Sequence, residues 1–222
     1  MSDPLFSLQG KVAMVTGGAQ NLGLDMAEAL GEAGADLAIT SREADKAERV
    51  GQELASYLGV RVLPLGMDLT DAASVEAAFA RVMEEYGRLD VLVNNAGGAR
   101  LSEGGVTTDT RSVEDFEYVI NINIRGTFLC CRQALPIMRE LGGGSIINLG
   151  SISGMVGRDR WVYEGSEMVP NMGDYTASKG AVIAYTRDLA AENGAHGIRV
   201  NSISPGGFER GQPPEFIRRY NK

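Results

Sequence analysis

The sequence predicts an α/β protein built on one doubly wound parallel β-sheet with helices on both faces. Short apolar segments alternate with longer amphipathic segments along the whole chain. This alternation is typical of β-α-β units, whose strands lie side by side in parallel and are covered on both faces. We find no linker and no break in composition, so residues 1–222 are expected to form a single domain.

The expected elements follow in chain order. The apolar segments predict strands at Lys11–Thr16, Asp36–Thr40, Arg61–Leu65, Leu89–Asn94, Ser145–Leu149 and Arg199–Ile203. The amphipathic segments between them predict helices at Leu22–Gly34, Glu43–Leu58, Asp71–Tyr86 with Asp71 as its N-cap, Val113–Leu141 and Asp174–Asn193.

Composition and charge exclude several classes of function. The net charge is −8 and the chain has no block of basic residues, which argues against binding to nucleic acid. No apolar run is long enough to cross a bilayer, and the N-terminus lacks the features of a signal peptide. The adjacent Cys130 and Cys131 are expected to be reduced core residues of a cytoplasmic protein. A single histidine gives little basis for a metal site, and none is predicted.

Catalytic chemistry is indicated by the segment from Tyr175 to Lys179. Residues four apart lie on the same face of a helix, so the lysine ammonium is expected to lie one turn from the tyrosine phenol. A nearby ammonium favours the phenolate, and such a pair can donate and accept a proton near neutral pH. The alternative is a surface tyrosine beside a solvated lysine.

A nucleotide site is indicated between the first strand and the first helix, where the sequence reads Thr-Gly-Gly-Ala-Gln-Asn-Leu-Gly from Thr16 to Gly23. Glycines there allow a tight turn and close approach of the backbone to a pyrophosphate at the helix N-terminus. Asn21 stands where a further glycine is expected, and asparagine is among the side chains that best tolerate a left-handed backbone. A plain tight turn would also use glycine.

The end of the second strand reads Thr40-Ser41-Arg42 and carries no Asp or Glu, although Glu43 follows. A carboxylate at this position binds a ribose 2′-hydroxyl, whereas a basic residue favours a 2′-phosphate. We therefore expect NADP as the preferred cofactor through Arg42, with NAD as the alternative. Asp68, after the third strand, suits the adenine amino group or could cap the next helix.

With these pieces in order, the chain resembles the short-chain dehydrogenase/reductase family. The residues that carry the resemblance are the Gly-rich turn with Asn21, Asn94-Asn95-Ala96-Gly97, Asn123, Ser151, Tyr175 with Lys179, and Pro205-Gly206. The resemblance covers nearly the whole chain. It implies a Rossmann-like sheet and NAD(P)-dependent interconversion of an alcohol and a ketone.

The resemblance also implies roles for four residues. Tyr175 would be the general acid/base, Lys179 would support it and hold the nicotinamide ribose, Ser151 would donate a hydrogen bond to the substrate oxygen, and Asn123 would position a proton-relaying water. Ser153 is a rival for Ser151 by proximity alone. The expected cofactor contacts are Gly17, Gln20, Asn21, Leu22, Gly23, Ser41, Arg42, Asp68, Leu69, Asn95, Ala96, Gly97, Tyr175, Lys179, Pro205 and Gly206.

Three features depart from the family pattern. Asn21 replaces a glycine. Residues 155–172 form an apparent insertion over the active site, or alternatively a rigid surface loop anchored by Trp161. The sequence ends at Lys222, before the C-terminal helix and strand with which family members usually continue.

The insertion and the Pro-Gly-Gly-Phe segment are similar to the gluconate 5-dehydrogenase branch of the family. A sugar or sugar-acid substrate is therefore expected, with Arg100, Arg158 and Arg160 as candidate carboxylate partners. The alternatives are a 3-oxoacyl-carrier-protein reductase and a protein that senses the cofactor without turnover. The resemblance further implies a homo-oligomer, either tetramer or dimer.

Overall fold

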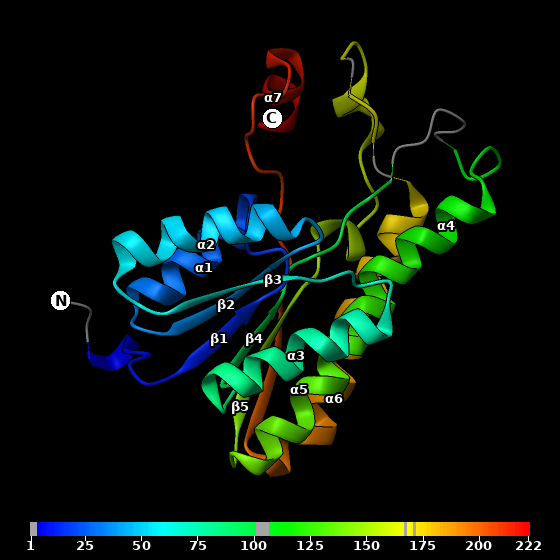
Figure 1. Cartoon of the computed structure of the whole chain (residues 1–222). Coiled ribbons are helices and arrows are strands. Elements are labelled where there is room, and N and C mark those ends of the chain that lie inside the picture. The colour runs from blue at the N-terminus through cyan, green and yellow to red at the C-terminus, as the bar shows by residue number, and fades with distance from the viewer. Residues whose placement is uncertain (1–3, 101–106, 167, 171) are drawn as a thin grey trace.

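Six parallel strands form the centre of the protein, in the order β3-β2-β1-β4-β5-β6 (Figure 1). The computed structural model describes residues 4–100, 107–166, 168–170 and 172–222. All six predicted strands are present, with ends that differ from the predicted ones by a residue or two. They are β1 (Val12–Val15), β2 (Asp36–Ser41), β3 (Val62–Gly66), β4 (Val91–Asn94), β5 (Gly144–Leu149) and β6 (Ile198–Ile203).

Helices cover both faces of the sheet, as the sequence predicts (Figure 1). Alternate residues of a strand point to opposite faces, so Val12 and Met14 of β1 join one core cluster while Ala13 and Val15 join the other. One face is covered by α1 (Asn21–Glu32) and α2 (Ala44–Leu58), and the other by α3 (Ala72–Tyr86), α5 (Gly126–Glu140) and α6 (Gly173–Asn193). Asp71 caps α3 as predicted, since its side chain accepts a hydrogen bond from the Ala73 N–H.

The long helix predicted at Val113–Leu141 is interrupted. It consists of α4 (Val113–Ile120), a π-helical segment at Asn121–Arg125, and α5. The N–H of Gly126 bonds to the carbonyl of Asn121, five residues back, which is the hydrogen-bonding pattern of a π-helix. Asn123 lies inside this segment, so the interruption occurs at a predicted site residue.

A seventh helix, α7 (Pro214–Tyr220), was not expected from the sequence. It packs against a 3-10 turn at Arg160–Tyr163 within the predicted insertion. Both segments rise from the same edge of the sheet (Figure 1). Two residues of the insertion, Glu167 and Asn171, lie outside the described residues.

Three expectations about composition can be compared with the described residues. Cys130 and Cys131 are buried in α5 and form no disulfide. No helix among the described residues is long and apolar enough to cross a membrane. In the same part of the chain, no group of three or more His, Cys, Asp or Glu side chains is arranged to hold a metal ion.

Candidate active site

A cavity of about 550 Å³ lies at the carboxyl ends of the strands, beside the point between β1 and β4 where the strand order reverses. Ligands of open α/β sheets bind at such switch points. Every cofactor contact expected from the sequence lines this cavity, and so does Ser151. The sequence analysis missed other lining residues, among them Thr40, Met67, Thr70, Tyr118, Phe208 and Arg210.

The Gly-rich turn has the backbone that its sequence predicts. Asn21 has φ of 52°, the left-handed conformation expected for an asparagine in place of glycine. A Cβ added at Gly23 would lie 2.2 Å from the carbonyl oxygen of Gly17 and 2.5 Å from Nδ2 of Asn95. The first turn of α1 therefore packs against the turn before it at a distance that only glycine permits. This brings the N-terminal backbone of α1 to the cavity wall, where it can bind a pyrophosphate.

Thr16 and Asn95 join this turn to the loop after β4. The hydroxyl of Thr16 accepts hydrogen bonds from the N–H groups of Asn95 and Ala96, each at 3.0 Å. In return, Nδ2 of Asn95 donates to the carbonyls of Thr16 at 2.9 Å and Gly17 at 3.3 Å. Asn94, by contrast, is buried and bonds to Asn148, so only the later residues of the Asn-Asn-Ala-Gly segment line the cavity. These bonds fix the shape of the cavity wall at this point.

At the end of β2, Ser41, Arg42 and Glu43 all line the cavity. The Ser41 hydroxyl accepts from the N–H of Glu43 at 3.1 Å and keeps its own proton available for a ligand. At the end of the neighbouring strand β3, Asp68 accepts hydrogen bonds from the backbone and the side chain of Thr70, which hold the pKa of its carboxyl below the usual range. Asp68 does not cap α3, a position taken by Asp71.

Ser151 lies on the loop directly after β5. Its Oγ accepts a hydrogen bond from the Ser153 N–H at 3.2 Å. The loop packs tightly on α6, because a Cβ at Gly154 would lie 2.6 Å from the Gly180 nitrogen. Ser153 does not line the cavity and its hydroxyl bonds to Arg158 instead. This placement favours Ser151 over Ser153 as the residue facing a substrate.

Tyr175 and Lys179 both line the cavity from the first turns of α6. The Lys179 Nζ lies 5.9 Å from the centre of the Tyr175 ring, as the four-residue spacing predicts. It donates a hydrogen bond to the Leu149 carbonyl at 2.7 Å, which fixes its position beside the Ser151 loop. Burial lowers the pKa of the Lys179 ammonium to about 8.

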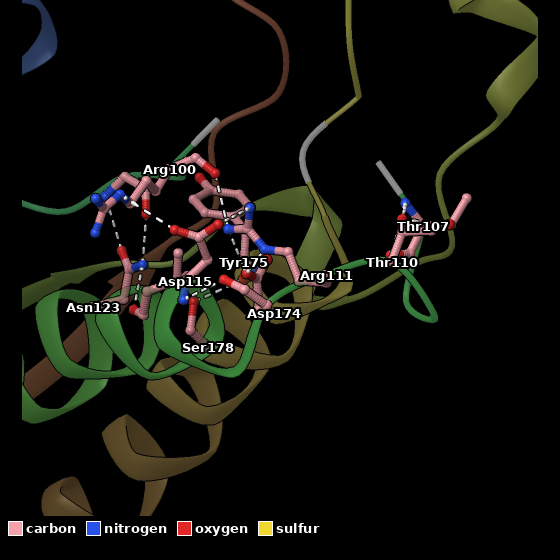
Figure 2. A network of polar contacts seen from close by, with 12 residues as sticks. Arg100, Thr107, Thr110, Arg111, Asp115, Asn123, Asp174, Tyr175 and Ser178 are labelled. Atoms are coloured by element: carbon pink, nitrogen blue, oxygen red, sulfur yellow. Dashed lines mark hydrogen bonds and ion pairs between the residues drawn. The ribbon is translucent and has the colours of Figure 1, made fainter. Parts of the chain in front are cut away.

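Asn123 stands behind the cavity rather than on its wall. Its Nδ2 donates to the carbonyls of Gly98 at 2.8 Å and Val119 at 2.9 Å, and its Oδ1 accepts from the Gly98 N–H at 3.0 Å (Figure 2). A Cβ at Gly97 would lie 2.4 Å from the same Oδ1. The side chain of Asn123 therefore holds the loop after β4 in place, while its role with water stays a prediction.

The predicted insertion forms a lobe with α7. The rings of Tyr163 and Phe216 are 5.2 Å apart between centroids. The Arg219 guanidinium lies 4.9 Å from the centre of the Trp161 ring and donates to the Trp161 carbonyl at 2.9 Å. Trp161 thus anchors the loop to α7. We call residues 158–166 and 214–220 the aromatic lobe.

The three arginines considered as carboxylate partners do not line the main cavity. Arg100 pairs with Asp115, and Arg158 bonds to Ser153 and Tyr163. Arg160 lines a second cavity, beside α4, together with Thr107 and Met172. A substrate carboxylate bound next to Ser151 would therefore not meet these three residues as they stand.

The fold and the cavity are those of a nucleotide-binding α/β oxidoreductase, and the Gly-rich turn, Ser151, Tyr175 and Lys179 follow in this order along the chain. A family model described as short chain dehydrogenase matches residues 11–213. The chain belongs to the short-chain dehydrogenase/reductase family.

Relatives with assigned names act on different alcohols. The chain is 40% identical over 200 residues to the D-threitol dehydrogenase of Mycolicibacterium smegmatis, a match that covers 90% of this chain and 71% of that protein. It is 37% identical over 203 residues to a galactitol 2-dehydrogenase (L-tagatose-forming) of Cereibacter sphaeroides, covering 91% and 73% of the two chains.

Solved structures agree with the fold. A short-chain type dehydrogenase/reductase from Mycobacterium marinum superimposes with a TM-score of 0.81 at 33% identity, covering 91% of this chain and 74% of that one. The protein is thus an oxidoreductase of alcohols or ketones, from a family that uses NAD(P) nucleotides.

Proposed function

We propose that this protein interconverts a secondary alcohol and a ketone on a polyol- or sugar-acid-like substrate, with NADP as its preferred cofactor. The observation that carries the proposal is the convergence of Ser151, Tyr175 and Lys179 on one cavity that also contains the Gly-rich turn. When bound there, the nicotinamide would supply the hydride chemistry.

Each of these side chains would act on the substrate oxygen or on its proton. Tyr175 exchanges the hydroxyl proton as the general acid/base, and Ser151 donates a hydrogen bond to the oxygen on which charge develops. Lys179, held by the Leu149 carbonyl, stabilises the phenolate form of Tyr175 and leaves two further N–H donors for the ribose. Asn123 holds Gly98 and the loop that forms the cavity wall.

The choice of substrate class is supported by the relatives, two of which are named for polyols. Assignment to the gluconate 5-dehydrogenase branch remains a narrower prediction within the same class. The two alternatives find less support. A cofactor sensor has no need of the combination of Ser151, Tyr175 and Lys179, and the net charge of −8 disfavours docking of an acidic carrier protein.

Tyr175→Phe tests the proposed chemistry. We expect turnover to fall by about 10²–10⁴-fold because the proton donor is lost, with nucleotide binding retained. Turnover is followed by nicotinamide absorbance with D-threitol, galactitol, gluconate and the corresponding ketones, and binding by calorimetry. Tyr185→Phe, on the same helix but off the cavity, is the matched control. Undiminished turnover in Tyr175→Phe would refute the catalytic assignment.

The NADP preference is supported by the position of Arg42 on the cavity wall beside Ser41. Arg42→Ala should weaken NADPH binding by about 10–100-fold and NADH binding by far less, because a charge-assisted hydrogen bond to phosphate is worth roughly 1.5–3 kcal/mol. Arg49→Ala, an exposed arginine on α2 paired with Glu53, is the control. Equal losses for the two nucleotides would show that Arg42 does not bind the 2′-phosphate.

Self-association is part of the proposal. Apolar side chains remain exposed on α4 and α5, namely Val113 at 66%, Phe116 at 46% and Phe128 at 45%. Contiguous exposed apolar patches mark interaction surfaces, and we propose that these side chains belong to one. We expect a dimer or tetramer by light scattering, and a monomer across the micromolar range would contradict this.

A further inference from the structure

A group of charged side chains, three of them buried and one 53% exposed, lies beside Tyr175 and has no part in the chemistry described above. It consists of Arg100, Arg111, Asp115 and Asp174, which we call the Arg111 cluster (Figure 2). The side chains of Arg111, Asp115 and Asp174 are only 6%, 8% and 1% exposed. Buried charges are costly unless they are paired, so their presence next to the proposed acid/base residue calls for a reason.

The cluster is bonded to the backbone of Tyr175. The Nε and Nη2 atoms of Arg111 both lie 2.8 Å from Oδ2 of Asp174. The other oxygen, Oδ1, accepts a hydrogen bond from the Tyr175 N–H at 2.7 Å. Both carboxylate oxygens are therefore used, one by the guanidinium and one by the first turn of α6. Through these bonds the pair connects Arg111 to the first turn of α6, which carries Tyr175.

The same guanidinium reaches the loop after β4. Nη2 of Arg111 donates to the carbonyl of Arg100 at 2.8 Å, and Nη1 lies 3.3 Å from Oδ2 of Asp115. Oδ1 of Asp115 in turn lies 3.3 Å from Nε of Arg100. The loop is thus held at Arg100 by this cluster and at Gly98 by Asn123. One arginine connects the cavity wall, the start of α4 and the start of α6.

The charges in the cluster balance formally, with two arginines against two aspartates. Without Arg111, the carboxylate bonded to the Tyr175 backbone would lose its partner in a site of low effective dielectric, where charge effects are strong. A negative charge left there disfavours the phenolate, and a positive charge left there favours it. Removing one member of the Arg111–Asp174 pair would therefore change the net charge beside the Tyr175 backbone as well as the bonds that hold the first turn of α6.

We propose that Arg111 and Asp174 are positioning residues for proton transfer at Tyr175, acting as one ion pair that fixes the first turn of α6 and neutralises the carboxylate bonded to the Tyr175 backbone. The inference rests on the proposed role of Tyr175. Among the described residues, the charged and titratable groups on the elements around Tyr175 include Lys179 and Asp174 of α6, Arg111, Asp115 and Tyr118 at α4, Arg100 after β4, and Arg158 bonded to Ser153.

The test is the pH dependence of kcat/KM for alcohol oxidation by the holoenzyme. Oxidation requires the phenolate, so the rate rises with pH through a midpoint. Arg111→Met should lower kcat by about tenfold or more and move the midpoint to higher pH by about one unit. Asp174→Asn should move the midpoint in the opposite direction. The double variant Arg111→Met/Asp174→Asn should return it toward the wild-type value.

Two further variants separate charge from packing. Arg111→Lys keeps the charge but loses the forked geometry, so we expect a wild-type midpoint with a reduced kcat. Arg139→Met removes a different arginine, which binds Glu192 and Asn193 at the far end of α6, and should leave the midpoint unchanged. If Arg111→Met fails to fold, Asp174→Asn and Arg111→Lys still give the two diagnostic midpoints.

The outcomes distinguish this inference from the proposed function. Loss of activity in the Arg111 and Asp174 variants with every midpoint unchanged would mean a purely structural pair, and would overturn the inference. An active Tyr175→Phe variant would instead overturn the proposed function. Midpoints that move in opposite directions, together with an inactive Tyr175→Phe variant, would support both.

Discussion

On the proposed cofactor side of the cavity, the walls are backbone groups set in place by short sequence motifs. The Gly17 and Gly23 turn, the left-handed Asn21, and the bonds between Thr16 and Asn95 all lie within a few residues of a strand end. The aromatic lobe, whose residues do not line the cavity, is held by side chains that are far apart in sequence. Tyr163 meets Phe216, and Arg219 meets Trp161.

This difference indicates different tolerance to change. At Gly23 the backbone packs so closely that no Cβ fits, and the surrounding backbone cannot move aside. A substitution there should therefore abolish nucleotide binding rather than weaken it by degrees. Side-chain contacts between two surface segments can be lost one at a time, because each is a modest contribution. The cofactor side should therefore be rigid and the aromatic lobe adaptable, which suits one shared cofactor and variable substrates.

The largest effect is expected for Gly23→Val. Its Cβ would overlap the Gly17 carbonyl and the Asn95 side chain, so α1 would have to move away from the turn. We expect a destabilisation of more than about 3 kcal/mol and no measurable nucleotide binding. Urea unfolding and calorimetric titration measure the two effects. Gly194→Ala, where an added Cβ meets nothing within 4 Å, is the control. Normal binding by Gly23→Val would show that this side is as adaptable as the lobe.

An intermediate effect is expected for Lys179→Met, on the part of the cavity wall that α6 forms. The pKa of Lys179 is about 8 in the folded protein and near 10.4 in an unfolded chain, so only the unfolded state holds the proton between these values. The free energy of unfolding should therefore rise with pH across this window, by up to about 3 kcal/mol relative to Lys179→Met. Denaturant titrations of both proteins at pH 7 and pH 10 measure the difference. If the two proteins differed in stability by the same amount at both pH values, Lys179 could not be a buried residue with a lowered pKa.

The smallest global effect is expected for Phe216→Ala in the aromatic lobe. The substitution removes ring contacts to Tyr163 and Tyr220, and should loosen the lobe by about 2 kcal/mol without unfolding the sheet. Substrate KM should rise while the affinity for NADPH stays the same, and limited proteolysis near Trp161 should accelerate. Tyr57→Ala, at an exposed site on α2, is the control. A loss of NADPH affinity as large as the rise in substrate KM would mean that the aromatic lobe and the cofactor side are coupled.

The same distinction explains what the sequence could predict. The strands, the turn, Asn21 and the Tyr175–Lys179 pair depend on local patterns, so they could be located from the sequence. The Arg111 cluster could not be located, because it joins three segments that only the tertiary fold brings together. Helix α7 did carry local signals that were missed, namely Pro214 at its first position, Glu215 in the first turn and Arg218 and Arg219 in the last.

The π-helical segment has a consequence for insertions and deletions in this region. It adds one residue to the turn that holds Asn123. The Thr127 hydroxyl donates a hydrogen bond to the Asn123 carbonyl at 2.7 Å. Each residue of an α-helix corresponds to about 100° of rotation. Deleting one residue would restore a regular helix but turn α5 by about that angle relative to α4. Either Asn123 would leave Gly98, or the face carrying Cys130 and Cys131 would leave the core. The number of residues between Asn123 and α5 thus sets the rotation of α5 relative to α4. A change of chain length here would prevent Asn123 from holding its loop while α5 completes the core.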